Sequence, residues 1–304
     1  DKSSNFSDSK GYNMTKVLIT TVPFANMNRL PLELLEGASV DYVINPLGRK
    51  LIEDELAEMA VDVDVIIAGT EPITKKVMEK AKNLKLISRV GIGLDSVDLV
   101  AAKSRGIAVS YTPDAPAPAV AELTIGLLIS LLRSIHISTS ELHKGIWHRH
   151  FGRRIPEITI GIIGAGRIGS RVIRRLSAFG SPRVLVNDIN PQTEISPALK
   201  LEWVDKETIF KEADVISVHT PLTRQTVDLI SDKEIALMKK GVLLINVARG
   251  GIINEKALEL GLKSGYVGGA AIDVFNKEPY VGELANIDQC ILTAHMGSMS
   301  LDCR

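Results

Sequence analysis

The segment Ile158–Gly169 reads ITIGIIGAGRIG and contains the pattern GxGxxG at Gly164, Gly166 and Gly169. A short apolar run precedes the glycines, and the helix-period stretch Arg167–Phe179 follows the first two of them. In a strand–turn–helix unit the first glycine permits a tight turn, the second lets the backbone approach a pyrophosphate, and the third lets helix and strand pack closely. The helix start also presents free N–H groups to phosphate oxygens. The segment therefore predicts a dinucleotide-binding βαβ unit.

The next apolar run, Val184–Ile189, carries a carboxylate near its end. Asp188 lies 19 residues after Gly169, the last glycine of the motif. A carboxylate at that position accepts hydrogen bonds from the ribose hydroxyls of an adenosine and repels a 2′-phosphate. No Arg or Lys follows within Ile189–Pro191. These features favour NAD over NADP, and the alternative for Asp188 alone is a solvated loop acid.

The alternation of short β-branched runs with charged, helix-period stretches continues on both sides of this segment. Continuous apolar runs between amphipathic helices are typical of strands that are buried on both faces of a parallel sheet. The expected strands are Val17–Thr20, Ser39–Asn45, Val61–Gly69, Leu84–Gly91, Ile107–Thr112, Ile158–Gly164, Val184–Ile189, Ala213–Thr220, Val242–Ala248, Gly268–Phe275 and Cys290–His295. The sequence therefore predicts an α/β protein with two doubly wound parallel sheets. We place a flavodoxin-like domain at residues 1–117 and a Rossmann domain at residues 118–296.

A proline-rich passage, Tyr111–Val120, separates the two halves and predicts a stiff, extended connector. A single long helix is expected from Ala121 to about His143, and its stretch Leu123–Leu132 carries little charge on any face. A helix with so few charged side chains is expected to be buried, either within the protein or against a second copy of it. We therefore expect this helix to cross between the domains and to contribute to a homodimer interface.

The composition excludes several classes of protein. The chain has 304 residues with 36 basic and 36 acidic side chains, and this balance argues against a nucleic-acid partner. Two cysteines are too few for a disulfide framework and favour a reducing, cytoplasmic location. The polar stretch Asp1–Asn13 lacks the apolar core of a signal peptide and is expected to be disordered or a tag. No apolar run is long enough to span a membrane, so no membrane partner is expected.

Three polar residues near the ends of expected strands have the properties that hydride transfer at a carbonyl requires. Arg249 follows LLINVA and precedes two glycines, and a guanidinium at a strand end can grip a carboxylate with two N–H groups. His295 ends ILTAH and is a candidate general acid and base. Glu278, in DVFNKEP, would favour the imidazolium if it hydrogen-bonds to His295. Taken singly, Arg249 also fits an ordinary ion pair and His295 a structural histidine.

Several motifs, taken in order along the chain, resemble those of one known family. They are SRVGIGLDSVDL (Ser88–Leu99), VAELTIGLLISLLR (Val120–Arg133), GIIGAGRIG (Gly161–Gly169), NVARGGIINEKAL (Asn246–Leu258), AIDVFNKEP (Ala271–Pro279) and TAHMGS (Thr293–Ser298). Together they resemble the motifs of the D-isomer-specific 2-hydroxyacid dehydrogenases. The resemblance runs from roughly Lys16 to Arg304, and among the members the chain is most similar to phosphoglycerate dehydrogenases.

The resemblance implies roles for particular residues of the second half. The family's Arg–Glu–His catalytic site falls on Arg249, Glu278 and His295. The residues expected to contact NAD are Gly164, Gly166, Arg167, Ile168, Gly169, Asp188, His219, Thr220, Pro221, Val247, Ala248, Asp273 and Gly297. Of these, Asp273 is expected near the carboxamide of the nicotinamide.

The resemblance also implies that the first half is a substrate domain, rejoined by residues 297–304, with the active site in the cleft between the domains. The residues expected to bind substrate are Arg89, Val90, Gly91, Ile92 and Gly93, of which the last four form a carboxylate-binding backbone turn. The sequence ends at Arg304, before the helix that in the family returns to the first domain, so we expect it to be incomplete there. A homodimer through the NAD-binding domain is expected as well.

The reaction expected from this resemblance is NAD-dependent interconversion of a D-2-hydroxy acid and its 2-keto acid. The preferred pair is 3-phosphoglycerate and 3-phosphohydroxypyruvate, which would place the protein in serine biosynthesis. Gly69-Thr70-Glu71 stands, however, where phosphoglycerate-active members carry a basic residue. The alternative is therefore a glyoxylate/hydroxypyruvate or D-lactate type reductase. A second alternative is an NADH-sensing, corepressor-like binding protein, because such proteins share the fold.

Three histidines, His143, His148 and His150, cluster in the sequence around Trp147. Their spacing does not match a zinc set, and we expect no cysteine or acidic ligand close by. The interpretation is a hydrated loop, with no metal site predicted for the chain. Cys303 has no neighbour that would activate its thiol, so it is not expected to act as a nucleophile.

Overall fold

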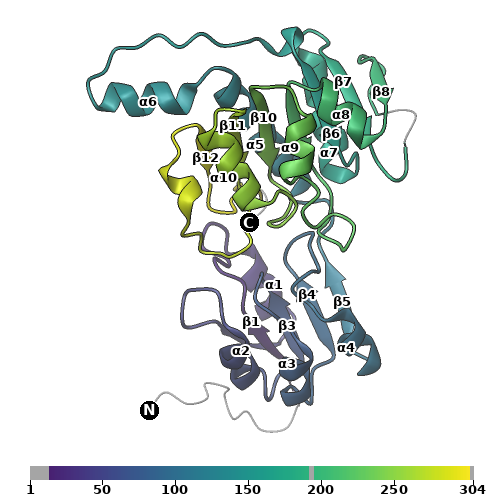
Figure 1. Ribbon diagram of the computed structural model, residues 1–304. Helices are drawn as coiled ribbons and strands as arrows, with labels where there is room; N and C mark the ends of the chain where they lie inside the picture. Colours follow the sequence, from purple (N-terminus) through teal and green to yellow (C-terminus); the bar gives the residue numbers. More distant parts are fainter. Residues whose placement is uncertain (1–13, 192–194, 302–304) are drawn as a thin grey trace. The chain divides into compact units, whose positions relative to one another are not determined.

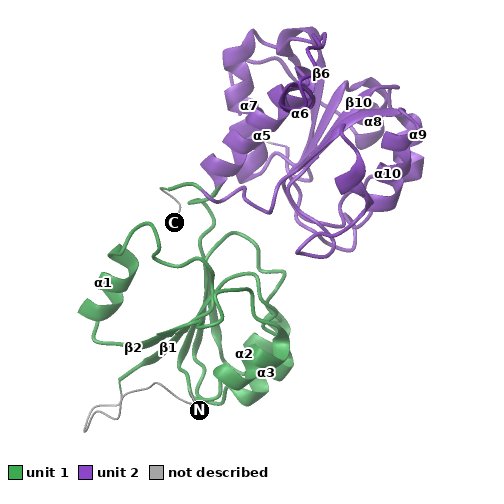
Figure 2. Cartoon of the chain, turned by 90° about the vertical axis from the view of Figure 1, so that its left-hand side faces the viewer, with its two compact units in different colours: residues 1–116, 300–304 green, residues 117–299 purple. Residues whose placement is uncertain are grey.

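A computed structural model describes residues 14–191 and 195–301 of the chain. It forms two compact units, of which unit 1 comprises residues 1–116 and 300–304 and unit 2 comprises residues 117–299 (Figure 2). Each unit has its own parallel sheet and its own hydrophobic core. The expectations for residues 1–13 and for Cys303 lie outside the described residues.

Unit 1 contains a five-stranded sheet whose strands are all parallel, in the order β2-β1-β3-β4-β5. This is the strand order of flavodoxin-like folds. The strands are β1 (Lys16–Ile19), β2 (Asp41–Ile44), β3 (Val65–Ala68), β4 (Leu86–Arg89) and β5 (Ala108–Tyr111). The helices are α1 (Leu30–Gly37), α2 (Glu53–Met59), α3 (Lys75–Lys80) and α4 (Leu99–Ser104).

The apolar strands of unit 1 are buried because helices cover both faces of the sheet. Leu18 and Ile66 pack with α2, α3 and α4 on one face. Val17 and Ile19, whose side chains alternate with that of Leu18, pack with Leu32 of α1 on the other. Burial on both faces explains why these strands read as continuous apolar runs rather than as alternating ones.

Unit 2 contains a seven-stranded parallel sheet in the order β12-β11-β10-β9-β6-β7-β8 (Figure 1). Its strands are β6 (Thr159–Ile163), β7 (Arg183–Asn187), β8 (Leu201–Trp203), β9 (Val215–Val218), β10 (Val242–Asn246), β11 (Val267–Ile272) and β12 (Cys290–Leu292). The strand order reverses between β6 and β9, as in the Rossmann fold, and ligands of such sheets bind at this switch point.

Helices cover both faces of the unit 2 sheet. The α-helices are α5 (Ala117–Leu132), α6 (Ile135–His143), α7 (Arg167–Leu176), α8 (Lys206–Glu212), α9 (Asp232–Leu237) and α10 (Glu255–Lys263). Short 3₁₀ turns are η1 (Ile155–Glu157), η2 (Ser177–Phe179) and η3 (Glu283–Asn286). Residues of α5 and α7 share one hydrophobic cluster, and residues of α8, α9 and α10 share the other. The prediction of two doubly wound α/β sheets is confirmed.

The prediction of a single long helix from Ala121 to about His143 is wrong, because the helix begins earlier and is broken into two helices. Helix α5 begins at Ala117, because Pro118 lies in the first turn, where the missing N–H breaks no hydrogen bond. It ends at Leu132, and Ser134, with φ of 50°, turns the chain by 65° into α6. The apolar side of α5 is buried, whereas α6 has no buried residue.

Two further observations concern the predicted elements. Strand β8 was not expected, because its three residues include Glu202 and form only an edge of the sheet. Within the described ranges, no single helix is long and apolar enough to cross a membrane, and the bent pair α5–α6 reaches that length and composition only when both helices are counted.

Candidate active site

The glycine loop joins β6 to α7 at the switch point of the unit 2 sheet. Gly164 adopts φ of +96°, and a Cβ placed on it would lie 2.7 Å from the backbone of His219. A Cβ on Gly169 would lie 2.0 Å from the carbonyl oxygen of Gly164, so helix and loop touch there. A Cβ on Gly166 would meet nothing within 4 Å. The protein's own packing therefore requires the outer two glycines, while the middle one borders open space at the start of α7, as a pyrophosphate site needs.

Asp188 is held against this loop from the end of β7. Its Oδ2 accepts a hydrogen bond of 2.7 Å from the N–H of Ala165, and its Oδ1 accepts one of 2.8 Å from the N–H of Asn190. Each carboxylate oxygen has a second lone-pair direction for a ribose hydroxyl. Arg167 and Ile168 form the first turn of α7 beside it. The arrangement fits the adenosine half of a dinucleotide.

Replacing Asp188 with Ala is expected to reduce the preference for NADH over NADPH by about tenfold or more, the equivalent of one charge-assisted hydrogen bond. The carboxylate would otherwise bind ribose hydroxyls and repel the 2′-phosphate. Fluorescence titration with both nucleotides measures the ratio of dissociation constants. Glu207→Ala, on the exposed surface of α8, is the matched control. An unchanged ratio in the Asp188 variant would remove this residue from the nucleotide site.

His219 and Thr220 follow β9 and lie beside the glycine loop. The Nε2 of His219 is 2.9 Å from the Oγ of Ser217, but its Nδ1 and the Oγ1 of Thr220 are buried without a hydrogen-bond partner among the described residues. Buried polar atoms are normally paired, so these two fit contacts to a bound dinucleotide. Burial lowers the pKa of His219 to about 4, which keeps the imidazole neutral at ordinary pH. Pro221 comes next in the chain.

A histidine–carboxylate pair lies beyond the ends of β11 and β12. The Nδ1 of His295 is 2.9 Å from the Oε2 of Glu278, and the Oε1 of Glu278 accepts a hydrogen bond from the N–H of Phe275 at 3.2 Å. Both side chains are partly exposed. The pairing uses Nδ1 and leaves Nε2 as the ring nitrogen that can reach a substrate. His295 has φ of 50°, a left-handed conformation that is uncommon for residues other than glycine and that clusters at functional sites.

Asp273 fixes the turn that carries this histidine. The Asp273 carboxylate is 1% exposed and accepts hydrogen bonds from the hydroxyl of Thr293 at 2.6 Å, from the N–H of Met296 at 2.8 Å and from that of Gly297 at 3.0 Å. The Asp273 carbonyl oxygen also accepts from the N–H of His295 at 2.9 Å. These bonds hold His295 in its left-handed conformation. The expected contact of Asp273 with the nicotinamide stays a prediction.

Arg249 lies in the turn after β10, together with Val247 and Ala248. Asn246 shapes this turn, since its side chain donates to the carbonyl oxygen of Arg249 at 2.9 Å and accepts from the N–H of Ala248 at 3.0 Å. The Nη1 of Arg249 donates to the carbonyl oxygen of Ala248 at 2.7 Å. Because β10, β11 and β12 are adjacent and parallel, the turns that carry Arg249, Glu278 and His295 all lie at the carboxyl ends of these strands.

The turn 90–93 of unit 1 follows β4. Two of its four N–H groups have protein partners, since that of Val90 donates to the carbonyl oxygen of Ala68 at 2.9 Å and that of Gly91 donates to the Oγ1 of Thr112 at 2.7 Å. The N–H groups of Ile92 and Gly93 have no hydrogen bond to other described residues. Arg89 precedes the turn and is 7% exposed. Ile92 and Gly93 are therefore the members of the turn that can bind a carboxylate.

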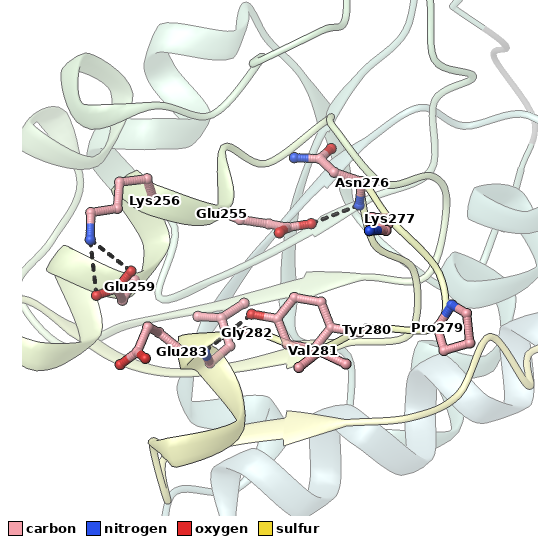
Figure 3. A pocket seen from close by; sticks show the side chains of 11 residues that line it. Glu255, Lys256, Glu259, Asn276, Lys277, Pro279, Tyr280, Val281, Gly282 and Glu283 are labelled. Carbon is pink, nitrogen blue, oxygen red and sulfur yellow. Dashed lines mark hydrogen bonds and ion pairs between the residues drawn. The ribbon is translucent and has the colours of Figure 1, made fainter.

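A cavity of about 360 Å³ lies between α10 and the loop 276–283 (Figure 3). Glu255 accepts a hydrogen bond of 2.7 Å from the N–H of Asn276 across it, and Lys256 pairs with Glu259 at its edge. The residues that line it are Glu255, Lys256, Glu259, Asn276, Lys277, Pro279, Tyr280, Val281, Gly282, Glu283 and Leu284. None of the predicted catalytic or NAD-binding residues is among them. The stacking of Tyr280 on Phe275, with ring centroids 4.2 Å apart, anchors the loop that carries Glu278.

Several residues that shape the site were not predicted from the sequence. The side chain of each of them makes a hydrogen bond that positions a predicted site residue or the turn that carries it. These residues are Thr112, Ser217, Asn246 and Thr293. Ser217 and Asn246 interrupt otherwise apolar strands, and a polar residue at such a buried position is the signal that identifies them.

The sequence matches the family described as D-isomer specific 2-hydroxyacid dehydrogenase, NAD binding domain, over residues 125–297. It is 40% identical over 261 residues to a hydroxypyruvate reductase of Thermotoga maritima, covering 84% of this chain and 84% of that protein. It is 41% identical over 254 residues to a D-3-phosphoglycerate dehydrogenase of Methanocaldococcus jannaschii, covering 82% of this chain and 48% of that protein. The solved structure of D-lactate dehydrogenase from Aquifex aeolicus, complexed with NAD and lactic acid, matches with a TM-score of 0.84 and 25% identity, covering 95% of this chain and 90% of that chain.

The fold and these matches define an NAD-binding dehydrogenase with two α/β units. The chain belongs to the D-isomer specific 2-hydroxyacid dehydrogenase family, so the resemblance seen in its motifs is confirmed. Its cofactor is NAD, as predicted from Asp188 and the glycine loop.

Proposed function

We propose that this chain interconverts a D-2-hydroxy acid and its 2-keto acid, with His295 as the general acid and base. The observation that carries this proposal is the 2.9 Å pairing of His295 with Glu278 in an NAD-binding unit. When bound, the cofactor would supply the hydride as NADH in reduction and accept it as NAD⁺ in oxidation. In reduction, protonated His295 donates its Nε2 proton to the keto oxygen, while Glu278 stabilises the imidazolium through Nδ1. In oxidation the neutral imidazole accepts the hydroxyl proton.

Arg249 completes the proposed chemistry as the residue that binds the substrate carboxylate. A guanidinium presents two parallel N–H groups to a carboxylate, and its charge polarises an adjacent keto group. The hydrogen bonds of Asn246 fix the turn from which this side chain extends. For unit 1, we propose that the N–H groups of Ile92 and Gly93 bind a substrate carboxylate.

We propose that the substrate is an unphosphorylated 2-keto acid such as hydroxypyruvate, rather than the 3-phosphoglycerate pair preferred from the sequence. Glu71, in the loop after β3, is 1% exposed, and its Oε1 accepts hydrogen bonds from the N–H of Gly69 at 2.8 Å and from the hydroxyl of Thr20. Its carboxylate adds negative charge to the loop that the family resemblance associates with phosphate recognition. The similarity to a hydroxypyruvate reductase over 84% of both chains supports this choice.

A phosphorylated substrate is the second candidate. The 41% identity to a D-3-phosphoglycerate dehydrogenase favours it, as does the buried cation of Arg89 at the end of β4. A glyoxylate or D-lactate type reductase would use the same proposed residues. An NADH-sensing binding protein would show no turnover with any of these acids.

Steady-state rates with NADH and different keto acids distinguish these candidates. We expect kcat/KM for hydroxypyruvate to exceed that for 3-phosphohydroxypyruvate. Glu71→Gln should shift the ratio toward the phosphorylated acid by about tenfold, since it removes one unit charge near the phosphate while keeping an acceptor for Gly69. Glu33→Gln, on the exposed surface of α1, is the control. A wild-type preference for the phosphorylated acid would contradict the proposed substrate, and absence of turnover would support the binding-protein alternative.

We also propose that the protein acts in the cytoplasm as a homodimer that forms through unit 2. Helix α6 buries none of its residues, and apolar side chains remain exposed on it and on the segment after it. These exposed side chains are Ile135, Leu142, Ile146, Trp147 and Phe151. Light scattering on the purified chain is expected to give twice the mass of one chain, and the mass of a single chain would contradict the dimer.

A further inference from the structure

The end of α6 reverses the chain direction through a glycine. Gly145 has φ of +76°, a conformation that glycine adopts without strain. The N–H of Ile146 donates to the carbonyl oxygen of Glu141 at 2.9 Å, and the N–H of Gly145 donates to that of Leu142 at 3.0 Å. These two bonds form a Schellman motif, which ends the helix and sends the next residues away from its axis. The following segment thereby passes close to the last turn of α6.

This reversal places two histidines over one glutamate. The Nε2 of His150 is 2.6 Å from one carboxylate oxygen of Glu141, and the Nδ1 of His148 is 3.5 Å from the other. The two imidazole rings lie 4.1 Å apart between centroids. His148 and His150 are separated by one residue, and in an extended segment such residues project to the same side. The expectation that no acidic ligand lies near these histidines is therefore wrong.

The three side chains have the composition and spacing of a transition-metal site. One ligand atom from each of Glu141, His148 and His150 lies within 4.8 Å of the others. Zn²⁺ binds imidazole nitrogen and carboxylate oxygen at about 2.0–2.2 Å, so small side-chain rotations bring all three atoms to one ion. Within the described ranges no other group of histidine, cysteine, aspartate or glutamate meets this spacing.

We propose that Glu141, His148 and His150 bind one divalent transition-metal ion of the Zn²⁺ type, with water in the fourth position. Imidazole and carboxylate ligands suit Zn²⁺, Ni²⁺ and Cu²⁺, whereas Mg²⁺ and Ca²⁺ prefer oxygen ligands alone. In the single chain, the side chains of Glu141 and His150 are 24% and 18% exposed, and that of His148 is 58% exposed. This site is separate from the residues assigned to the dehydrogenase reaction.

The bound ion would fix the segment after α6 to the helix. Without it, the described contacts between these side chains are the two hydrogen-bonding pairs of Glu141. Three coordinate bonds from two separate stretches of chain replace them, so opening of the segment becomes coupled to loss of the ion.

Isothermal titration of the purified, metal-free chain with ZnCl₂ tests the site. We expect one tight site per chain in the wild type, and affinity lowered by about 100-fold or more in His148→Ala and His150→Ala, since loss of even an outer-shell partner costs 10–100-fold. His143→Ala removes an exposed imidazole of the same helix outside the cluster and should keep wild-type affinity. Circular dichroism verifies that each variant is folded.

The metal selectivity of the site provides the second measurement. Ni²⁺ should bind to the wild type and to His143→Ala but much more weakly to His150→Ala, whereas Mg²⁺ should bind to none of them. The proposal is overturned if the wild type binds no Zn²⁺, if the His148 and His150 variants bind it as tightly as the wild type, or if Mg²⁺ binds as tightly as Zn²⁺.

Discussion

Turnover of a His295→Asn variant is expected to fall by about 10²–10⁴-fold, the range that general acid–base catalysis contributes. An amide cannot exchange a proton with the substrate at neutral pH. Asn tolerates the left-handed conformation that His295 adopts at φ of 50°, so the turn held by Asp273 should persist. The dissociation constant for NADH should therefore stay close to that of the wild type.

NADH oxidation under saturating keto acid measures this effect, and fluorescence titration measures nucleotide affinity. His143→Asn makes the same chemical change on the exposed side of α6 and should leave both quantities unaffected. Glu278→Gln keeps a hydrogen-bond acceptor near Nδ1 but loses the charge, so turnover should fall less than in the His295 variant. Wild-type turnover in His295→Asn would show that another residue moves the proton.

The second large effect is expected at the glycine loop, where two substitutions should separate binding from folding. Gly166→Ala places a methyl group where no protein atom lies within 4 Å, so the free energy of unfolding should change by less than about 1 kcal/mol. The same methyl group intrudes on the pyrophosphate. Crowding of this kind costs about 1–3 kcal/mol, so the dissociation constant for NADH should rise by about 10–100-fold.

Gly169→Ala is the matched comparison in the same motif. Its methyl group would lie 2.0 Å from the carbonyl oxygen of Gly164, so the loop and α7 must move apart. We expect a clear loss of thermal stability together with the loss of NADH binding. Thermal unfolding and fluorescence titration on both variants provide the data. Equal destabilisation by the two alanines would show that Gly166 serves packing rather than cofactor access.

The parts of the fold that could be predicted depend on local patterns. Apolar runs identified the long strands, and the glycine motif located the switch point, because each pattern is imposed by the packing of a few neighbouring residues. Strand β8 has three partly buried residues and gives no such pattern. The bend at Ser134 also lacks a local signal, since no glycine or proline marks it.

For the candidate site as well, local patterns could be read from the sequence, whereas contacts between distant residues could not. Asp188, Glu278 and His295 could be proposed as site residues from the sequence, because each follows or ends an apolar run and suits a stated chemical role. The partners that position them could not, because the hydrogen bond from Thr293 to Asp273 spans 20 residues. The approach of Glu141 to His148 and His150 was missed for a similar reason, since it depends on the chain reversal at Gly145.

The most direct test of the proposed chemistry is a crystal structure of the chain with NADH and oxamate, an unreactive analogue of a 2-keto acid. We expect the Nε2 of His295 within about 2.6–3.2 Å of the oxygen that mimics the keto group, with Nδ1 still paired to Glu278. The guanidinium of Arg249 should contact the oxamate carboxylate. A complex in which Nε2 of His295 makes no contact with oxamate, and another ionisable side chain contacts that oxygen, would contradict the account.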